Sequence, residues 1–208
     1  ILVIGSGIIG KFNALELSEL GFQITVIDPS QDKNSSNAAL GLLMGNIYQK
    51  RKGRSWALRE QSIELWPKWL KKLQEFNNEL NIEKPLIQLT TKEETFKKLE
   101  KFINENNVQG LKILKKDSII LENINKAFQT RNIKGIISHR DGRINAGTLL
   151  KTLDAYLKNK KINFLKDKII KIRKSNSHWI ATSKTKKEIQ SDVIILCNSL
   201  NTLDLIDK

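Results

Sequence analysis

Three closely spaced glycines, Gly5, Gly7 and Gly10, are the residues whose types and spacing point most directly to chemistry. In a G-x-G-x-x-G pattern the first glycine permits a tight turn, the second lets a pyrophosphate approach the backbone, and the third lets a helix pack closely on a strand. Asp28 follows, and an acid about 20 residues after the glycines accepts hydrogen bonds from ribose hydroxyls. Together these residues predict a site for an adenine dinucleotide.

The elements that must position these residues follow from the flanking sequence. Residues 1–4 are an apolar run too short for a helix, which predicts a buried strand. A helix is expected from the glycines to about Leu20, with Gly21 in the position of a C-terminal capping glycine. A second strand is expected over 23–27, ending at Asp28. The N–H groups and positive dipole end of the helix would then hold the diphosphate.

The sequence after Asp28-Pro29 departs from the pattern of an NAD-binding domain, in which a third parallel strand would follow soon. Residues 30–37 are instead polar and are expected to form a loop, and residues 38–45 are mostly small or apolar. The first stretch can donate hydroxyls and amides to phosphate, and the second lets a flat ring system lie near the backbone. A loop without a ligand is an equal alternative. The absent strand disfavours a plain NAD-dependent dehydrogenase.

Hydrophobic periodicity and turn residues predict the remaining helices and strands. The expected elements are a long helix over 54–80, kinked or divided at Pro67; a strand over 85–90; a helix over 93–106; short strands over 112–121 and 135–138; a hairpin-type turn at Asp141-Gly142; a helix over 146–157; strands over 161–165 and 168–172; and a hairpin of 178–183 with 187–190. Residues 193–197 form a continuous apolar run, which predicts a parallel strand that returns to the first sheet.

The composition limits the class of protein. The 208 residues carry a net charge of +14, but the lysines are scattered in pairs, so nucleic acid is not an expected partner. The one cysteine, Cys197, excludes a disulfide framework, fits the cytoplasm and is expected to be inert in a buried strand. No apolar run approaches membrane-spanning length, and His139 and His178 lack partners for a metal site. Both ends look cut, which suggests the N-terminal part of a longer protein.

Taken in order, these segments resemble the FAD-dependent amino-acid oxidase (DAO) superfamily, which includes D-amino-acid oxidase, glycine oxidase, sarcosine oxidase and D-amino-acid dehydrogenase. The resemblance starts with the strand, glycine turn and acid of residues 3–10 and 26–28. Residues 35–43 are similar to the family's Ser/Ala/Gly segment beside the flavin, 141–145 to its D-G-R-[VI]-[DN] signature, and 168–172 and 192–196 to its later FAD-domain strands. The spacing from Ser35-Ser36 to Gly41 looks closest to glycine oxidase.

The resemblance implies FAD as the cofactor and a set of residues that bind it. These are Gly5, Gly7, Ile8, Ile9, Gly10, Asp28, Pro29, Ser35, Ser36, Leu40, Gly41, Leu42 and Ile169. By the same resemblance Ile8 and Ile9 would contact the diphosphate, and Asp28 would contact the adenosine ribose. Ser35, Ser36 and residues 40–42 would line the diphosphate and the isoalloxazine, and Ile169 would contact the adenine. In the family, the last strand precedes Ala-Gly-Ala, whereas here Asn198 stands in place of the glycine. The turn is expected to be kept, because Asn tolerates left-handed dihedrals. The family's substrate residues would lie beyond residue 208, so no catalytic residue is assigned.

The implied fold is α/β: a Rossmann-like FAD-binding domain of the glutathione-reductase type with an inserted, incomplete α+β substrate domain. The expected boundaries are 1–84 and 141–208 for the two parts of the FAD-binding domain and 85–140 for the substrate domain. The implied function is oxidation of a small amine or amino acid of the glycine or D-amino-acid type, at a CH–NH or CH–NH2 group, by hydride transfer to flavin. Two alternatives stay open: the flavin domain of a tRNA wobble-uridine modifying oxidoreductase, and a flavin-binding protein without turnover.

Overall fold

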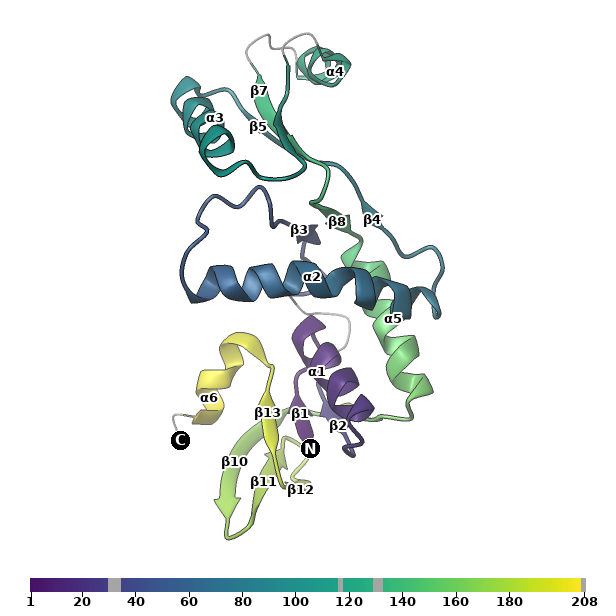
Figure 1. Ribbon diagram of the computed structural model, residues 1–208. Helices are drawn as coiled ribbons and strands as arrows, with labels where there is room; N and C mark the ends of the chain where they lie inside the picture. Colours follow the sequence, from purple (N-terminus) through teal and green to yellow (C-terminus); the bar gives the residue numbers. More distant parts are fainter. Residues whose placement is uncertain (30–34, 116–117, 129–132, 207–208) are drawn as a thin grey trace. The chain divides into compact units, whose positions relative to one another are not determined.

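The computed structural model describes residues 1–29, 35–115, 118–128 and 133–206 (Figure 1). Contacts divide the chain into two compact units. Unit 1 comprises Ile1–Ala39, Leu73–Leu80 and Ala146–Lys208, and unit 2 comprises Leu40–Lys72 and Asn81–Asn145. The expected domain boundaries at residues 84 and 140 stay a prediction.

The centre of unit 1 is a parallel sheet with the strand order β13-β1-β2-β9. β1 (Leu2–Ile4) pairs with β2 (Thr25–Ile27) and with β13 (Ile194–Leu196), and β2 pairs with β9 (Asn163–Leu165). All three residues of β1 are buried, as expected for a central strand of a parallel sheet that is covered on both faces. The predicted first strand is confirmed, and so is the predicted parallel strand that returns to the first sheet. Unit 1 has the expected Rossmann-like α/β arrangement.

Helix α1 (Ile8–Glu19) follows the glycine turn and packs on β1 and β2. The residue after its C-cap, Gly21, is left-handed with φ +90° and donates its N–H to Ser18 O at 3.1 Å. A glycine adopts this conformation without steric cost, which is why it ends helices so often. The predicted helix end and capping glycine are confirmed.

Two polar pairs join α1 to α5 (Ala146–Asn159). Lys11 is buried and its ammonium pairs with Asp154, which offsets the cost of burying the charge. The Tyr156 hydroxyl donates to Glu19 Oε1 at 2.6 Å. Burial, with the nearby Glu19 carboxylate, raises the pKa of Tyr156 far above its usual value, so this hydroxyl stays a donor.

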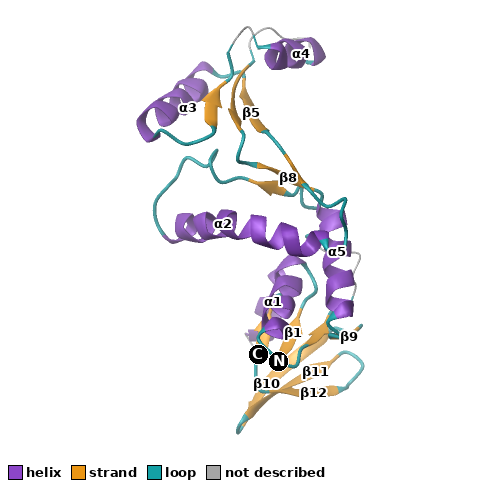
Figure 2. Ribbon diagram, turned by 45° about the vertical axis from the view of Figure 1, so that its right-hand side comes forward, coloured by secondary structure: helices purple, strands orange, loops and turns teal. Residues whose placement is uncertain are grey.

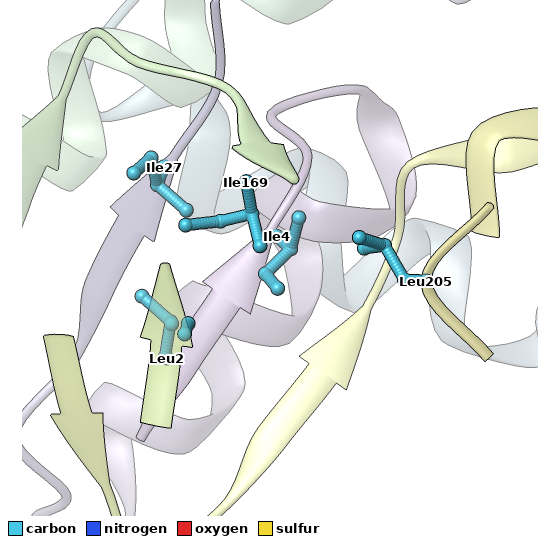
Figure 3. Close-up of a cluster of buried hydrophobic side chains, with 6 residues drawn as sticks. Leu2, Ile4, Ile27, Ile169 and Leu205 are labelled. Carbon is cyan, nitrogen blue, oxygen red and sulfur yellow. The ribbon is translucent and has the colours of Figure 1, made fainter. Parts of the chain in front are cut away.

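The second sheet of unit 1 is antiparallel, in the order β10 (Ile169–Ser175), β11 (His178–Ser183) and β12 (Glu188–Ser191). The predicted hairpin of β11 with β12 is confirmed. Both sheets contribute to one hydrophobic core, which also includes a residue of α6 (Leu203–Ile206), the helix after the short 3-10 helix η1 (Ser199–Thr202). The buried members are Leu2, Ile4, Ile27, Ile169, Ala181 and Leu205 (Figure 3).

Unit 2 contains an antiparallel sheet in the order β5 (Leu86–Thr90), β7 (Lys134–Ser138) and β6 (Leu111–Ile113). Helix α3 (Glu93–Asn106) packs on all three strands (Figure 2). Its apolar residues Leu99 and Phe102 are buried against Ile136 of β7. The helix predicted over 93–106 is confirmed to the residue.

A smaller sheet of unit 2 joins three segments that are far apart in the sequence. Its central strand β8 (Gly142–Ile144) pairs with β3 (Leu42–Leu43) on one side and β4 (Ile82–Glu83) on the other, both antiparallel. The hairpin predicted at Asp141-Gly142 is wrong, because β8 does not pair with the preceding strand β7. Long-range pairing outweighs the local preference of an Asp-Gly dipeptide for a hairpin turn.

Helix α2 (Arg54–Gln74) runs without a break through Pro67. Of the two arrangements left open by the sequence, a single helix is the one formed. Proline removes one backbone hydrogen bond inside a helix, and the burial of Trp69 and Leu73 just after it supplies apolar packing that offsets the loss. Neither α2 nor any other helix in the described ranges is long and apolar enough to cross a membrane.

The strand predicted over 112–121 is wrong in its second half. The chain leaves β6 at Ile113 and begins helix α4 (Ile119–Ala127) after Ser118, whose hydroxyl accepts the Leu121 N–H at 3.4 Å. Residues 116 and 117 lie outside the described residues. A serine N-cap outweighed the β-branched run that suggested a strand.

Candidate functional site

The glycine turn between β1 and α1 leaves no room for side chains. Gly5 has φ +107°, and a Cβ there would lie 2.5 Å from Cys197 O. A Cβ on Gly10 would lie 1.9 Å from Gly5 O, so this glycine lets α1 sit directly against the turn. The Gly5 N–H donates to Ile27 O at 2.9 Å, which ties the turn to β2. The first and third glycines are therefore required by the backbone itself.

The N-terminus of α1 carries the features of an anion site. Gly7 is its N-cap, in extended conformation, without a side-chain cap and with no acid in the first turn. The Ile8 N–H donates to Ser36 Oγ at 2.9 Å, and a Cβ on Gly7 would lie 3.0 Å from the same oxygen. The hydroxyl oxygen of Ser36 thus occupies a position at the helix N-terminus that attracts oxygen acceptors, and a Cβ on residue 7 would crowd this oxygen.

Asp28 lies where β2 ends, at the carboxyl edge of the parallel sheet. Its Oδ2 accepts the Ser6 N–H at 2.7 Å, and its own N–H donates to Leu165 O at 3.1 Å. These bonds hold the carboxylate beside the glycine turn. The ligand site of open parallel sheets is at this edge.

A groove with a volume of about 1020 Å³ runs along this edge within unit 1. Its lining brings together the predicted residues Gly5, Gly7, Ile8, Ile9, Asp28, Pro29, Ser35, Ser36 and Ile169. Four members of its apolar floor, Ile4, Ile27, Ile169 and Leu205, belong to the core of Figure 3. Gly10 does not line the groove and acts through the packing of α1 against Gly5. Residues 30–34 lie outside the described residues.

The other predicted residues, Leu40, Gly41 and Leu42, belong to unit 2 and do not line this groove. Leu40 O accepts a hydrogen bond from Arg143 Nε at 3.1 Å, and Gly41 is left-handed with φ +71°. Leu42 is the first residue of β3. Their expected contact with a flavin ring stays a prediction.

The aspartate of the D-G-R signature has a role that sequence reasoning missed. Asp141 is 2% exposed, and its carboxylate accepts three backbone N–H groups. Oδ1 accepts from Gly45 at 2.7 Å and from Asn46 at 2.9 Å, and Oδ2 accepts from Ile47 at 2.7 Å. It fixes the segment directly after β3. The sequence suggested a turn because its partners lie far away in the chain.

The turn after β13 corrects two expectations. Asn198 has φ −93°, so it is not the left-handed residue; Ser199 is, with φ +56°. Cys197 was expected inside a buried strand, but it follows β13, is only partly buried and lines the groove. Burial raises the pKa of the Cys197 thiol above its usual value.

Solved structures with the same fold include two oxidases and a deaminase. Glycine oxidase from Geobacillus kaustophilus aligns with a TM-score of 0.82 at 18% identity over 98% of this chain and 56% of that chain. Iminodiacetate oxidase from Chelativorans sp. BNC1 aligns at 0.82 and 16% identity over 99% and 57%. L-amino acid deaminase from Proteus myxofaciens aligns at 0.77 and 17% identity over 97% and 45%. The chain therefore spans about half the length of these proteins.

No curated protein matches the sequence at a significant level. A family model described as DAO, FAD dependent oxidoreductase, matches residues 1–207. The cofactor of this family is FAD. The match extends over nearly the whole chain and includes the glycine turn, Asp28 and the D-G-R signature, so the chain belongs to the family of FAD-dependent oxidoreductases.

Proposed function

We propose that the protein oxidises a small amine or amino acid of the glycine or D-amino-acid type, with FAD bound in the groove of unit 1. The observation that carries this proposal is the convergence of the glycine turn, the N-terminus of α1 and Asp28 on one groove. Membership of the family supports the redox chemistry. Glycine oxidase and iminodiacetate oxidase among the structural neighbours support an amine or amino-acid donor.

The groove residues fit an adenine dinucleotide. A Cβ on Gly7 would crowd the Ser36 hydroxyl, so glycine lets this hydroxyl and the backbone approach a diphosphate together at the helix N-terminus. Asp28, held by the Ser6 N–H, presents a carboxylate to the ribose hydroxyls. Ile169 and the apolar floor suit the flat adenine ring. We infer that Leu40, Gly41 and Leu42 line the isoalloxazine.

The chemical contribution of the protein is to bind and to orient. When bound, the flavin supplies the hydride acceptor for the α-carbon of the substrate. In this chain the N-terminus of α1 at Ile8 and Ile9, with Ser36 Oγ on the Ile8 N–H, would hold the diphosphate, and the Asp28 carboxylate would orient the ribose. Asp141 holds residues 45–47, next to the segment 40–42, in one conformation. No residue of this chain is assigned to proton transfer.

The first test is a titration of the chain with FAD, followed by absorbance and by thermal unfolding. We expect a yellow complex and a raised Tm. Asp28→Asn removes a charged acceptor and weakens FAD binding about tenfold. Asp192→Asn, outside the groove, leaves the affinity unchanged. A colourless protein whose Tm does not respond to FAD contradicts the proposal.

The second test addresses the donor. Glycine, sarcosine and D-alanine are added in turn to the FAD-loaded protein without oxygen, and the flavin absorbance is followed. Bleaching by at least one of them supports amine oxidation. A yellow protein that none of these or other small amines bleaches contradicts the proposed donor class but not FAD binding.

A further inference from the structure

The positive charge of the chain is concentrated in unit 2. Unit 2 carries 21 lysines and arginines and 10 acidic residues, a net charge of +11, whereas unit 1 carries 15 and 12, a net charge of +3. The lysines are scattered in pairs, but Arg51, Arg54 and Arg59 lie together in the segment after β3 and the first turns of α2 (Figure 1). No acid occurs over residues 33–59, and no step above uses this region.

Six cations of unit 2, here called the basic patch, come from two segments that are far apart in the sequence. They are Lys50, Arg51, Lys52, Arg54, Arg59 and Arg140. Asn46 and Gln109 connect the two segments. Arg51 Nη2 donates to Asn46 O at 3.2 Å, and Asn46 Nδ2 donates to Gln109 O at 3.5 Å. Arg140 Nη1 in turn donates to Gln109 Oε1 at 2.9 Å, so the fold brings Arg140 close to Arg51.

Aromatic rings hold two guanidinium groups of the basic patch in place. The Arg51 guanidinium lies 4.7 Å from the centre of the Trp56 ring, and the Arg59 guanidinium lies 4.0 Å from the centre of the Tyr48 ring. Arg59 Nη1 also donates to Met44 O at 2.6 Å. A guanidinium oriented in this way offers a planar fork of N–H donors that matches the oxygens of a phosphate.

The cations of the basic patch have no acidic partner among the described residues. None of the six forms a salt bridge there, and Asp141, next to Arg140, is buried and accepts three backbone N–H groups. Other cations of unit 2 are paired with acids, namely Lys98, Lys101, Lys126, Lys134 and Arg143.

The N-terminus of α2 adds to the positive potential of the basic patch. Arg54 is the first residue of this helix, whose first turn has no acid and whose dipole is positive at this end. Like charges so close together repel one another, and a bound polyanion relieves this repulsion. The basic patch is therefore suited to a ligand that carries several negative charges.

We propose that the basic patch binds the phosphodiester backbone of a nucleic acid, an inference that goes beyond the proposed function and does not depend on it. Six neighbouring cations exceed what one carboxylate or one phosphate neutralises, whereas each successive phosphate of a strand supplies one charge. Tyr48 and Trp56 are partly buried and each has a guanidinium over its ring, so they are poorly placed to stack on bases or to enter a bilayer. The contact is with phosphates, which implies affinity without sequence preference.

Fluorescence anisotropy of the whole chain with a short labelled single-stranded RNA tests this site. We expect a Kd on the order of 10 µM near physiological salt, and an affinity that falls steeply as the salt concentration rises. DNA of the same sequence binds equally well, because its phosphates are the same. The combined variant Lys50→Gln, Lys52→Gln and Arg54→Gln weakens binding by about tenfold or more and lowers the slope of log affinity against log salt by about 2.

The matched control is the combined variant Lys184→Gln, Lys186→Gln and Lys187→Gln, which removes three exposed cations of unit 1 instead. The two variants have the same net charge, and we expect the control to bind RNA like the parent chain. Equal losses of affinity in the two variants overturn the proposal, because net charge alone would then explain the binding. Circular dichroism spectra of both variants exclude misfolding as the cause of a loss.

Three further outcomes overturn the proposal. Phosphatidylserine vesicles or polyglutamate that bind more tightly than RNA, with binding lost in the patch variant, identify a membrane or an acidic protein as the ligand. Displacement of RNA by FAD places the RNA in the groove of unit 1. A preference of more than about tenfold for RNA or for DNA contradicts recognition through phosphates alone. A chain that binds RNA through the basic patch but does not bind FAD contradicts the proposed function and leaves this site standing.

Discussion

Asp28 of unit 1 and Asp141 of unit 2 use one interaction, a carboxylate that accepts backbone N–H groups, for two different purposes. Asp28 Oδ2 accepts from Ser6, and the residue lines the groove at the edge of the parallel sheet. Asp141 is buried and accepts from Gly45, Asn46 and Ile47. Burial separates the two roles: a carboxylate in a groove can also meet a ligand, whereas a buried one only shapes the chain.

The comparison also shows why recognising a motif does not establish its role. Both aspartates lie in segments that resemble family signatures, but the sequence predicted a binding role for Asp28 and only a turn at Asp141. Only the pattern of donors distinguishes them. The Asp141 carboxylate accepts three backbone N–H groups at distances of 2.7–2.9 Å. These bonds secure the loop, and Asp141 itself is inaccessible to solvent.

The largest expected effect comes from Asp141→Asn. The amide offers one oxygen acceptor in place of two, so one or two of the three backbone N–H groups of residues 45–47 face an NH2 group and lose their acceptor in the interior. We expect the free energy of unfolding to fall by about 3 kcal/mol, measured by urea denaturation. Asp28→Asn is the matched variant and loses about 1 kcal/mol or less, with its main effect on FAD affinity. Equal losses of stability in the two variants would break the comparison.

Gly10→Ala tests whether the turn beside Asp28 is as tightly packed as it looks. The new Cβ would lie 1.9 Å from Gly5 O, so α1 must move away from the turn. We expect a loss of stability of about 2 kcal/mol together with weaker FAD binding. Thermal unfolding with and without FAD measures both. An alanine variant as stable as the parent chain would show that the helix shifts freely, contrary to this description.

Ser199→Gly sharpens the comparison from the opposite direction, because it should stabilise unit 1. Ser199 is left-handed with φ +56°, a conformation that costs a residue with a Cβ about 1 kcal/mol. Glycine removes this cost but loses more entropy on folding, so we expect a net gain of about 0.5 kcal/mol in urea denaturation. Asn198→Gly is the control without such a gain, since Asn198 has φ −93°. A gain in stability confined to Asn198→Gly would instead indicate that residue 198 is the left-handed position of this turn, as the sequence suggested.

The smallest effect concerns Cys197, in the same groove as Asp28. Burial raises the pKa of its thiol, so the folded state favours the protonated form. This contribution to stability is fully present below the pKa of the unfolded thiol and is lost as the pH rises from that value through the higher pKa of the folded state. We expect alkylation by iodoacetamide at pH 8 to be slower than for a free thiol, and slower still with FAD bound. Mass spectrometry of the labelled chain follows the rate, and a rate equal to that of free cysteine contradicts the expectation.

The sequence predicted best the elements whose partners are close in the chain. The β1 strand, α1, its glycine cap and β2 follow one another within the first 28 residues, and each is indicated by local sequence. Helix α3 and the β11–β12 hairpin are equally local and were equally well predicted. The erroneous strand over 112–121 arose where a short apolar run gave no period that distinguishes strand from helix.

The candidate site was predictable only in part, for the same reason. The groove residues of the glycine turn and Asp28 come from one βαβ-like unit with a known pattern. The left-handed position at Ser199 and the exposure of Cys197 depend on how the chain after β13 meets Gly5, which lies some 190 positions earlier. No recognisable pattern in the sequence predicted that Arg51 and Arg59 lie over aromatic rings in unit 2.

The sequence by itself determined the glycine turn between β1 and α1 and, through the ordered set of segments that resemble the family, the family and its cofactor, because each of these signals is local in the chain. Only the tertiary structure decided that Asp141 anchors a loop and that β8 joins β3 and β4. It also decided that the Arg51 guanidinium lies over the Trp56 ring and the Arg59 guanidinium over the Tyr48 ring. The physical reason is distance along the chain. The amides that Asp141 accepts lie 94–96 positions away, and only the folded chain brings such groups together.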